Sequence, residues 1–234
     1  MLEVTYITLK VAILATLINF PFALYIGWIL GRRNPRGRLI LEVVISLPLA
    51  LPPVVTGYVL LIALGSRSPI GTFTQAVFGS DIIFTWVAAS LAAAVVSFPL
   101  MVRSIIVAMS TVDPRLERSA RSLGAGPMKT FFSITLPLSY QGVIAGTLLG
   151  FVRALSEFGA TIIVAGNIPG VTQTLPLAIF ARVQTGRTSD AFELVAISVL
   201  LARRSEERRV GKECRTRWSP YHEKKTPHPP HHSA

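Results

Sequence analysis

The sequence predicts an all-α protein, a polytopic bundle of transmembrane helices. Of its 234 residues, 51% are hydrophobic and only 15% are charged, with a mean hydropathy of +0.54. Soluble globular chains carry about 25% charged residues, so the depletion of charge indicates a chain whose main solvent is lipid. The net charge is +11, but the Lys and Arg residues cluster between long apolar runs, as the charges that flank membrane spans do. A nucleic-acid binder would instead spread them over a polar surface, and we therefore expect no nucleic-acid partner.

Five apolar runs predict about five spans. The first, residues 11–30, is long enough to cross the roughly 30 Å hydrocarbon core, and no cleavage signal precedes it. The second, residues 39–64, is interrupted by Pro48, Pro52 and Pro53. The third and fourth cover residues 82–102 and 138–164, whereas the fifth, residues 192–202, is too short to cross a bilayer. We interpret the last run as a truncated span.

The connecting segments predict the orientation. Residues 31–38 hold four arginines and no acid, and residues 103–130 hold five basic residues against two acidic ones. The connections at 65–81 and 166–174 carry almost no charge. Because Lys and Arg bias loops toward the cytoplasm, we predict a multi-pass protein of the cytoplasmic (inner) membrane with its N-terminus outside. The short apolar stretch 175–184 is then an interfacial or re-entrant helix on the outer side.

Residues 203–234 differ from the rest in composition. They contain nine basic and four acidic residues, all four histidines and the single cysteine. A lipid-binding polybasic segment and a histidine-rich metal tract are two functional interpretations. We prefer a third, that this tail is non-native, because it interrupts an apolar run and residues 204–222 resemble a translated sequencing adapter. The expected domain is therefore residues 1–202, in which the natural protein would continue its last span, and no metal site is expected.

Residues 112–137, here called the hairpin, carry the most informative pattern between the spans. Asp113 can cap a helix that begins at Pro114 and ends at the Gly-Ala-Gly segment 124–126. A second helix starts near Pro127 and carries Phe131, Phe132 and Ile134 toward the membrane. The helical spacing predicts one apolar face in the first helix, formed by Leu116, Ala120 and Leu123. Such a hairpin could lie in the membrane interface or dock into the groove of a partner protein.

The hairpin resembles a known loop. Gly124, followed after nine residues by Ile134-Thr-Leu-Pro137, resembles the EAA loop of binding-protein-dependent ABC importer permeases, EAA-x3-G-x9-I-x-LP. In that family the loop is the coupling helix that inserts into the ATPase subunit. Here the EAA triplet falls on Arg118, Ser119 and Ala120, with Glu117 one place early, so no particular salt bridge with the ATPase is expected. The resemblance implies the following coupling residues: Glu117, Arg118, Ser119, Ala120, Leu123, Gly124, Ala125 and Gly126.

The proline-rich segment 47–58 (LPLALPPVVTGY) offers a second candidate site. Prolines remove amide donors and kink a helix, and in lipid the freed carbonyls need protein or water partners. The segment is either a packing kink or a discontinuous helix that lines a translocation path. It closely resembles the second span of molybdate permeases. The candidate path residues here are Pro52, Pro53, Thr56, Gly57 and Tyr58.

The third candidate site contains two charges inside the fourth run. Arg153 and Glu157 stand four residues apart, so they can pair on one helix face. Charges near the centre of a span cost about 2.5–3.5 kcal/mol each and normally face the protein interior. The pair is either a structural tie or a neighbour of the gate, with Gly159 and Thr161 facing the path. The surrounding stretch, SEFGATIIVAGNIPG, again resembles the molybdate branch.

The resemblance covers residues 5–202 and implies the membrane-spanning subunit of an ATP-driven importer that translocates molybdate by alternating access. It implies a homodimer in membrane lipid, two cytoplasmic ATPase subunits and an extracytoplasmic oxyanion-binding protein. A sulfate or tungstate permease is the alternative within the class. A secondary transporter with broken helices is the alternative outside it, although such a carrier has no use for the hairpin.

No enzymatic role is expected for this chain. The segment 124–130 is similar to a phosphate-binding loop, but Met128 stands where that motif needs a second glycine before the lysine. The chain is therefore not expected to bind ATP. We find no catalytic residues and expect no cofactor.

Overall fold

A computed structural model describes residues 2–33, 37–187 and 189–200 of the chain. All regular elements in these ranges are helices, as the sequence predicts. The proposed non-native tail, 203–234, and the end of the fifth apolar run lie outside the described residues.

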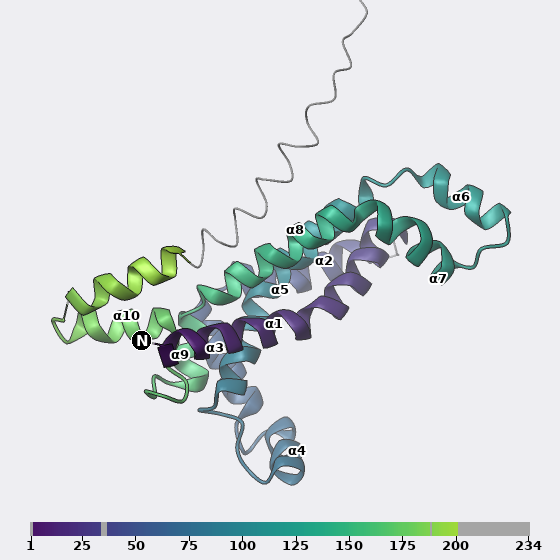
Figure 1. The fold of residues 1–234 in the computed structure, drawn as a ribbon. Coiled ribbons are helices and arrows are strands. Elements are labelled where there is room, and N and C mark those ends of the chain that lie inside the picture. Colours follow the sequence, from purple (N-terminus) through teal and green to yellow (C-terminus); the bar gives the residue numbers. More distant parts are fainter. Residues whose placement is uncertain (1, 34–36, 188, 201–234) are drawn as a thin grey trace, which may run out of the picture.

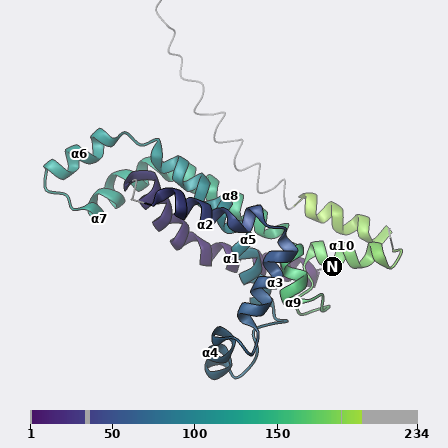
Figure 2. The same ribbon diagram turned by 180° about the vertical axis from the view of Figure 1, so that it is seen from behind.

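Three long helices form the body of the molecule and run side by side along its length (Figures 1 and 2). They are α1 (Leu2–Trp28), α5 (Trp86–Ser110) and α8 (Leu136–Leu155). Two π-helical segments adjoin them, η1 (Ile29–Arg33) after α1 and η2 (Phe131–Thr135) before α8. The shorter helices are α2 (Arg38–Ala50), α3 (Pro53–Leu64), α4 (Pro69–Phe78), α6 (Pro114–Ser122), α7 (Pro127–Thr130), α9 (Gly159–Ala165) and α10 (Leu175–Gln184).

Glycines allow α5 to approach both of its long neighbours closely. A Cβ atom at Gly142 would lie 2.3 Å from the Ala108 Cβ, and one at Gly27 would lie 2.5 Å from the Ile105 Cγ2. Small residues at four-residue spacing are typical of tightly packed membrane helices, because packing drives their association in lipid. The glycines that contact α5 are Gly27 and Gly31 in α1–η1, and Gly142, Gly146 and Gly150 in α8.

The core differs between the two halves of the bundle. The cluster around the N-terminal half of α1 and the start of α5 is mostly alanine, including Ala12, Ala15 and Ala92. The cluster toward the hairpin contains larger side chains such as Met101 and Phe131. The close approach of α1 and α5 in the first half therefore depends on small side chains, whereas the second half is filled by bulky ones.

The first four predicted runs correspond to described helices, although their limits differ. Three described segments, 2–33, 86–110 and 127–155, are long and apolar enough to cross a membrane. The pair α2 and α3, bent by 106°, passes the same test together, so up to four spans are described. The fifth run is helical at residues 189–200, and its last residues are not described.

Two predicted runs needed correction. The fourth run, predicted as one helix over 138–164, is divided between α8 and α9 by the non-helical residues 156–158. In the second run the break lies at residues 51–52, as Pro52 and Pro53 predict, but Pro48 lies inside α2 and does not interrupt it. A proline near the end of a helix is tolerated when the local carbonyls find other partners.

The connections alternate between the two ends of the molecule. The hairpin lies at one end, and the N-terminus, α9 and α10 lie at the other (Figures 1 and 2). Arg32 in the first connection bonds to the hairpin, and the Phe84 amide donates to the Val164 carbonyl at the opposite end. The second connection also contains α4, which the sequence analysis did not predict and which Ser68 caps by accepting from the Gly71 amide.

Candidate functional site

The hairpin begins where the sequence predicts. The Asp113 carboxylate accepts a hydrogen bond of 2.8 Å from the Arg115 amide, and α6 starts at Pro114. The helix ends at Ser122, and Gly124 then takes a φ of +85°, a left-handed conformation that glycine adopts without the penalty of a Cβ. The second helix, α7, continues through η2 into α8, so the hairpin is a direct extension of a long helix.

The hairpin projects beyond the bundle (Figure 1), and it exposes apolar side chains. Leu123 is 88% exposed, and Leu116, Met128 and Phe132 are about half exposed or more. Large exposed apolar groups gathered in one place are typical of a contact surface. Seven of the eight predicted coupling residues are exposed or half-buried: Arg118, Ser119, Ala120, Leu123, Gly124, Ala125 and Gly126.

Glu117, the eighth, is buried at the base of the hairpin. Its Oε1 accepts hydrogen bonds from the Arg32 Nε at 2.8 Å and the Thr135 hydroxyl at 2.5 Å. Arg32 also donates from Nη1 to the Val112 carbonyl at 2.7 Å. We call these four residues the Arg32 cluster.

The environment of Glu117 stabilises its charged form. Burial alone would raise the pKa of this carboxyl, but the hydrogen bonds from Arg32 and Thr135 and the nearby positive charges outweigh burial, and the pKa is lowered. Glu117 is therefore a carboxylate at neutral pH.

At the other end of the molecule the two helix breaks meet. A Cβ at Gly57 in α3 would lie 2.8 Å from both the Cα and the carbonyl oxygen of Ala160 in α9. A Cβ at Gly159 would lie 2.9 Å from the Pro53 Cβ. Predicted path residues from two distant parts of the sequence are thus brought into backbone-to-backbone contact.

Arg153 and Glu157 pair as predicted, with 2.8 Å between the Arg153 Nη1 and the Glu157 Oε2. The prediction that they share one helix face was wrong, because Glu157 lies in the break after α8. Its second oxygen accepts from the Ala160 amide at 2.9 Å, which satisfies a free donor at the start of α9. Glu157 therefore joins the end of α8 to the beginning of α9.

The other predicted path residues lie around this contact in different environments. Thr56 and Thr161 are buried, and the Thr56 hydroxyl has no hydrogen-bond partner. Pro52 and Tyr58 are exposed. Thr56 is thus a predicted path residue whose buried hydroxyl has no partner.

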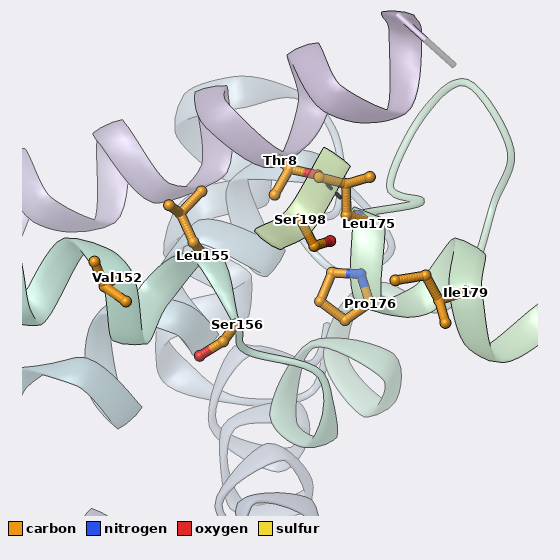
Figure 3. A pocket seen from close by; sticks show the side chains of 8 residues that line it. All are labelled: Thr8, Val152, Leu155, Ser156, Leu175, Pro176, Ile179 and Ser198. Atoms are coloured by element: carbon orange, nitrogen blue, oxygen red, sulfur yellow. Dashed lines mark hydrogen bonds between the residues drawn. The ribbon is translucent and has the colours of Figure 1, made fainter. Parts of the chain in front are cut away.

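A half-open cavity of about 200 Å³ lies beside the α8/α9 break (Figure 3). It is lined by α1, α8, α10 and the helical residues 189–200, and the Thr8 hydroxyl there accepts from the Leu175 amide at 2.8 Å. Among the described residues that line it, Thr8, Ser156 and Ser198 are polar and none is charged. In the described part of the chain, no group of three or more His, Cys, Asp or Glu could hold a metal ion.

Sequence reasoning missed Arg32 and Thr135. Arg32 is 85 positions from Glu117, and nothing in a single sequence pairs two residues at such a distance. The one available signal was Glu117 itself, since a carboxylate next to an apolar membrane boundary needs a cationic partner.

Comparison with known proteins agrees with this architecture. Residues 23–202 match the family described as the binding-protein-dependent transport system inner membrane component. The chain belongs to this family. It is therefore a membrane permease component and works with a binding protein and an ATPase, as such transport systems do.

Family members with known names are similar over most of their length. The chain is 49% identical over 201 residues to the Molybdenum transport system permease protein ModB of Escherichia coli K12, covering 86% of this chain and 88% of that protein. It is 37% identical over 202 residues to a probable sulfate transport system permease protein of Chlorokybus atmophyticus, covering 84% and 70%. The fold is similar to that of a chain of the MetNI methionine ABC transporter, with a TM-score of 0.68, 16% identity and coverage of 88% and 90%.

Proposed function

We propose that this permease moves molybdate inward across the cytoplasmic membrane by alternating access. The observation that carries the proposal is the 49% identity with the Escherichia coli molybdenum permease over 86% of the chain. The lower identity with a sulfate permease, 37%, makes sulfate the second candidate, and tungstate shares the charge and shape of molybdate.

The proposed assembly is a homodimer with two cytoplasmic ATPase subunits and an extracytoplasmic oxyanion-binding protein. The hairpin would dock into the ATPase subunit through its exposed apolar residues, chiefly Leu116 and Leu123. This orientation places the arginine-rich ends inside and the N-terminus outside, in keeping with the charge bias of cytoplasmic loops.

The proposed path passes the contact between α3 and α9. Discontinuous helices in membranes occur where the free backbone groups line a cavity or are covered by protein. Thr56, with its unpartnered hydroxyl, is the group we assign to the path. Glu157 has both oxygens engaged, which favours a structural role for the Arg153–Glu157 pair over a gating one.

The test is uptake of labelled molybdate into proteoliposomes that contain the full chain with its own ATPase and binding-protein subunits. We expect ATP-dependent uptake that excess tungstate inhibits and excess sulfate leaves within twofold of the control. Preferential uptake of sulfate would support the second candidate. Uptake without ATP and without the binding protein would instead favour a secondary transporter.

A further inference from the structure

The Arg32 cluster joins α6 to the ends of three long helices. Arg32 lies in η1 at the end of the first span, Val112 follows the end of α5, and Thr135 ends η2, immediately before α8. Glu117 is the member of the cluster that lies in α6. One guanidinium and one carboxylate therefore connect α6 to all three helices that contact one another along the bundle.

This cluster is enclosed by the protein. The side chains of Arg32 and Glu117 are 6% and 10% exposed, and Thr135 is 1% exposed. Arg32 bonds to two different segments: it donates to the Glu117 carboxylate at 2.8 Å and to the Val112 carbonyl at 2.7 Å. A guanidinium suits such a site, since its planar group of donors is fixed in geometry and always charged.

The position of Glu117 opposes a direct role in binding the ATPase. On α6, Leu116, Ala120 and Leu123 share one face, and Glu117 points to another, toward the bundle. The exposed apolar face is thus available to a partner while Glu117 is already occupied within the chain. The hairpin has one side for docking and another for attachment to the spans.

We propose that Arg32 is a positioning residue for transport: it attaches the hairpin to the first span, so that a displacement of α6 moves the end of α1 together with α5 and α8. The hairpin is covalently continuous with α5 and α8. It has no direct covalent connection to the first span. This inference rests on the proposed function, in which the hairpin receives motion from the ATPase.

The experiment compares three variants with the wild type in the reconstituted transporter, measuring molybdate taken up per ATP hydrolysed. Arg32→Ala removes the link and leaves Glu117 unpaired. The double variant Arg32→Met/Glu117→Leu removes the link without leaving a buried charge, and such apolar replacements of buried ion pairs often preserve stability. Arg33→Ala is the matched control, because Arg33 is the adjacent arginine and lies over the Trp28 ring instead.

We expect the double variant to assemble with the ATPase and to hydrolyse ATP, but to take up at least tenfold less molybdate per ATP than the wild type. Arg33→Ala should stay within twofold of the wild type. Normal coupling in the double variant would overturn the proposal, even if Arg32→Ala alone were impaired, because the unpaired Glu117 would then explain the defect. Failure of both Arg32 variants to assemble would assign the cluster to stability alone and would also overturn it.

The wild-type measurement separates this inference from the proposed function. If the wild type shows no ATP-driven uptake of any tested oxyanion, the proposed function fails. If the wild type couples ATP hydrolysis to uptake and the double variant couples equally well, only the role of Arg32 fails.

Discussion

Two regions of the molecule are each organised around a buried glutamate paired with an arginine, and they use the pair differently. Glu117 bonds to Arg32, 85 positions away, and joins separate elements at the base of the hairpin. Glu157 bonds to Arg153, four positions away, and joins two consecutive helices at a break. The contact between α3 and α9 near Glu157 is made mainly by backbone atoms and glycines. The base of the hairpin is thus held by polar bonds between distant residues, whereas the break combines a local ion pair with close packing of α9 against α3.

The largest expected effect follows from removing the long-range pair. Glu117→Ala leaves Arg32 buried without its carboxylate, and breaking a buried pair in this way costs about 3–5 kcal/mol. We expect a strong loss of folded protein, measured by thermal unfolding in detergent. In domains of this size, a loss of 1 kcal/mol lowers the unfolding midpoint by roughly 2–4 °C. A midpoint within 2 °C of the wild type would therefore show that the pair contributes little.

The second largest effect is expected where α3 packs closely against α9. Gly57→Ala places a methyl group against the Ala160 backbone, which cannot move aside as a flexible side chain can, so we expect a destabilisation of about 3 kcal/mol. Gly126→Ala is the matched control, because a Cβ there meets nothing within 4 Å and its φ is −66°. Equal unfolding midpoints for the two variants would contradict the packing argument.

The local pair should matter less than the long-range one. Glu157→Ala removes the partner of Arg153, whose side chain is 26% exposed and so less enclosed than that of Arg32; we therefore expect a loss of about 2 kcal/mol and less folded protein. Glu157→Gln should recover part of this loss, since an amide oxygen can still accept from the Ala160 amide. Normal folding with ATP turnover that no longer depends on substrate would instead indicate a gating role.

A smaller effect is expected at the tip of the hairpin. Gly124→Ala puts a side chain into the left-handed conformation, at a cost of about 1 kcal/mol, although space is available. We expect normal insertion in the membrane and weaker coupling of ATP hydrolysis to uptake. Coupling of ATP hydrolysis to uptake equal to that of the wild type would show that the left-handed conformation of Gly124 is not needed for coupling.

The smallest effect is a dependence on pH. Because the pKa of Glu117 in the folded protein lies below its ordinary value of 4.5, its contribution to stability is complete above that value and is lost as the pH falls through the folded pKa. The contribution of Glu117 to the unfolding midpoint should therefore stay constant between pH 6 and pH 8. On acidification below about pH 4.5, Glu117→Gln should lose less stability than the wild type. Identical acid profiles for the two proteins would contradict the assigned charge state.

Local signals in the sequence predicted much of this fold. The bounds of α10, the start of α6 at Pro114 and the break before Pro53 all follow from nearby residues. The break between α8 and α9 was missed because no proline marks it; in the structure Glu157 lies there and bonds to the helices on both sides.

The contacts between distant elements could not be predicted in the same way. The Arg32–Glu117 pair and the approach of Gly57 to Ala160 depend on how the helices pack, and a single sequence carries no record of that. The four-residue glycine spacing in α8 was a visible signal of close packing, but it names no partner helix.

The fit of α5 between glycines has a consequence for how such sequences diverge. At Gly142 the space that a Cβ would occupy is already taken by Ala108, whose Cβ would lie 2.3 Å away. A methyl group gained at position 142 would therefore require the methyl group at position 108 to be lost, so a change at one position favours a change at the other. The same relation links Gly27 with Ile105, so the residues of one long helix limit which side chains fit in its neighbours.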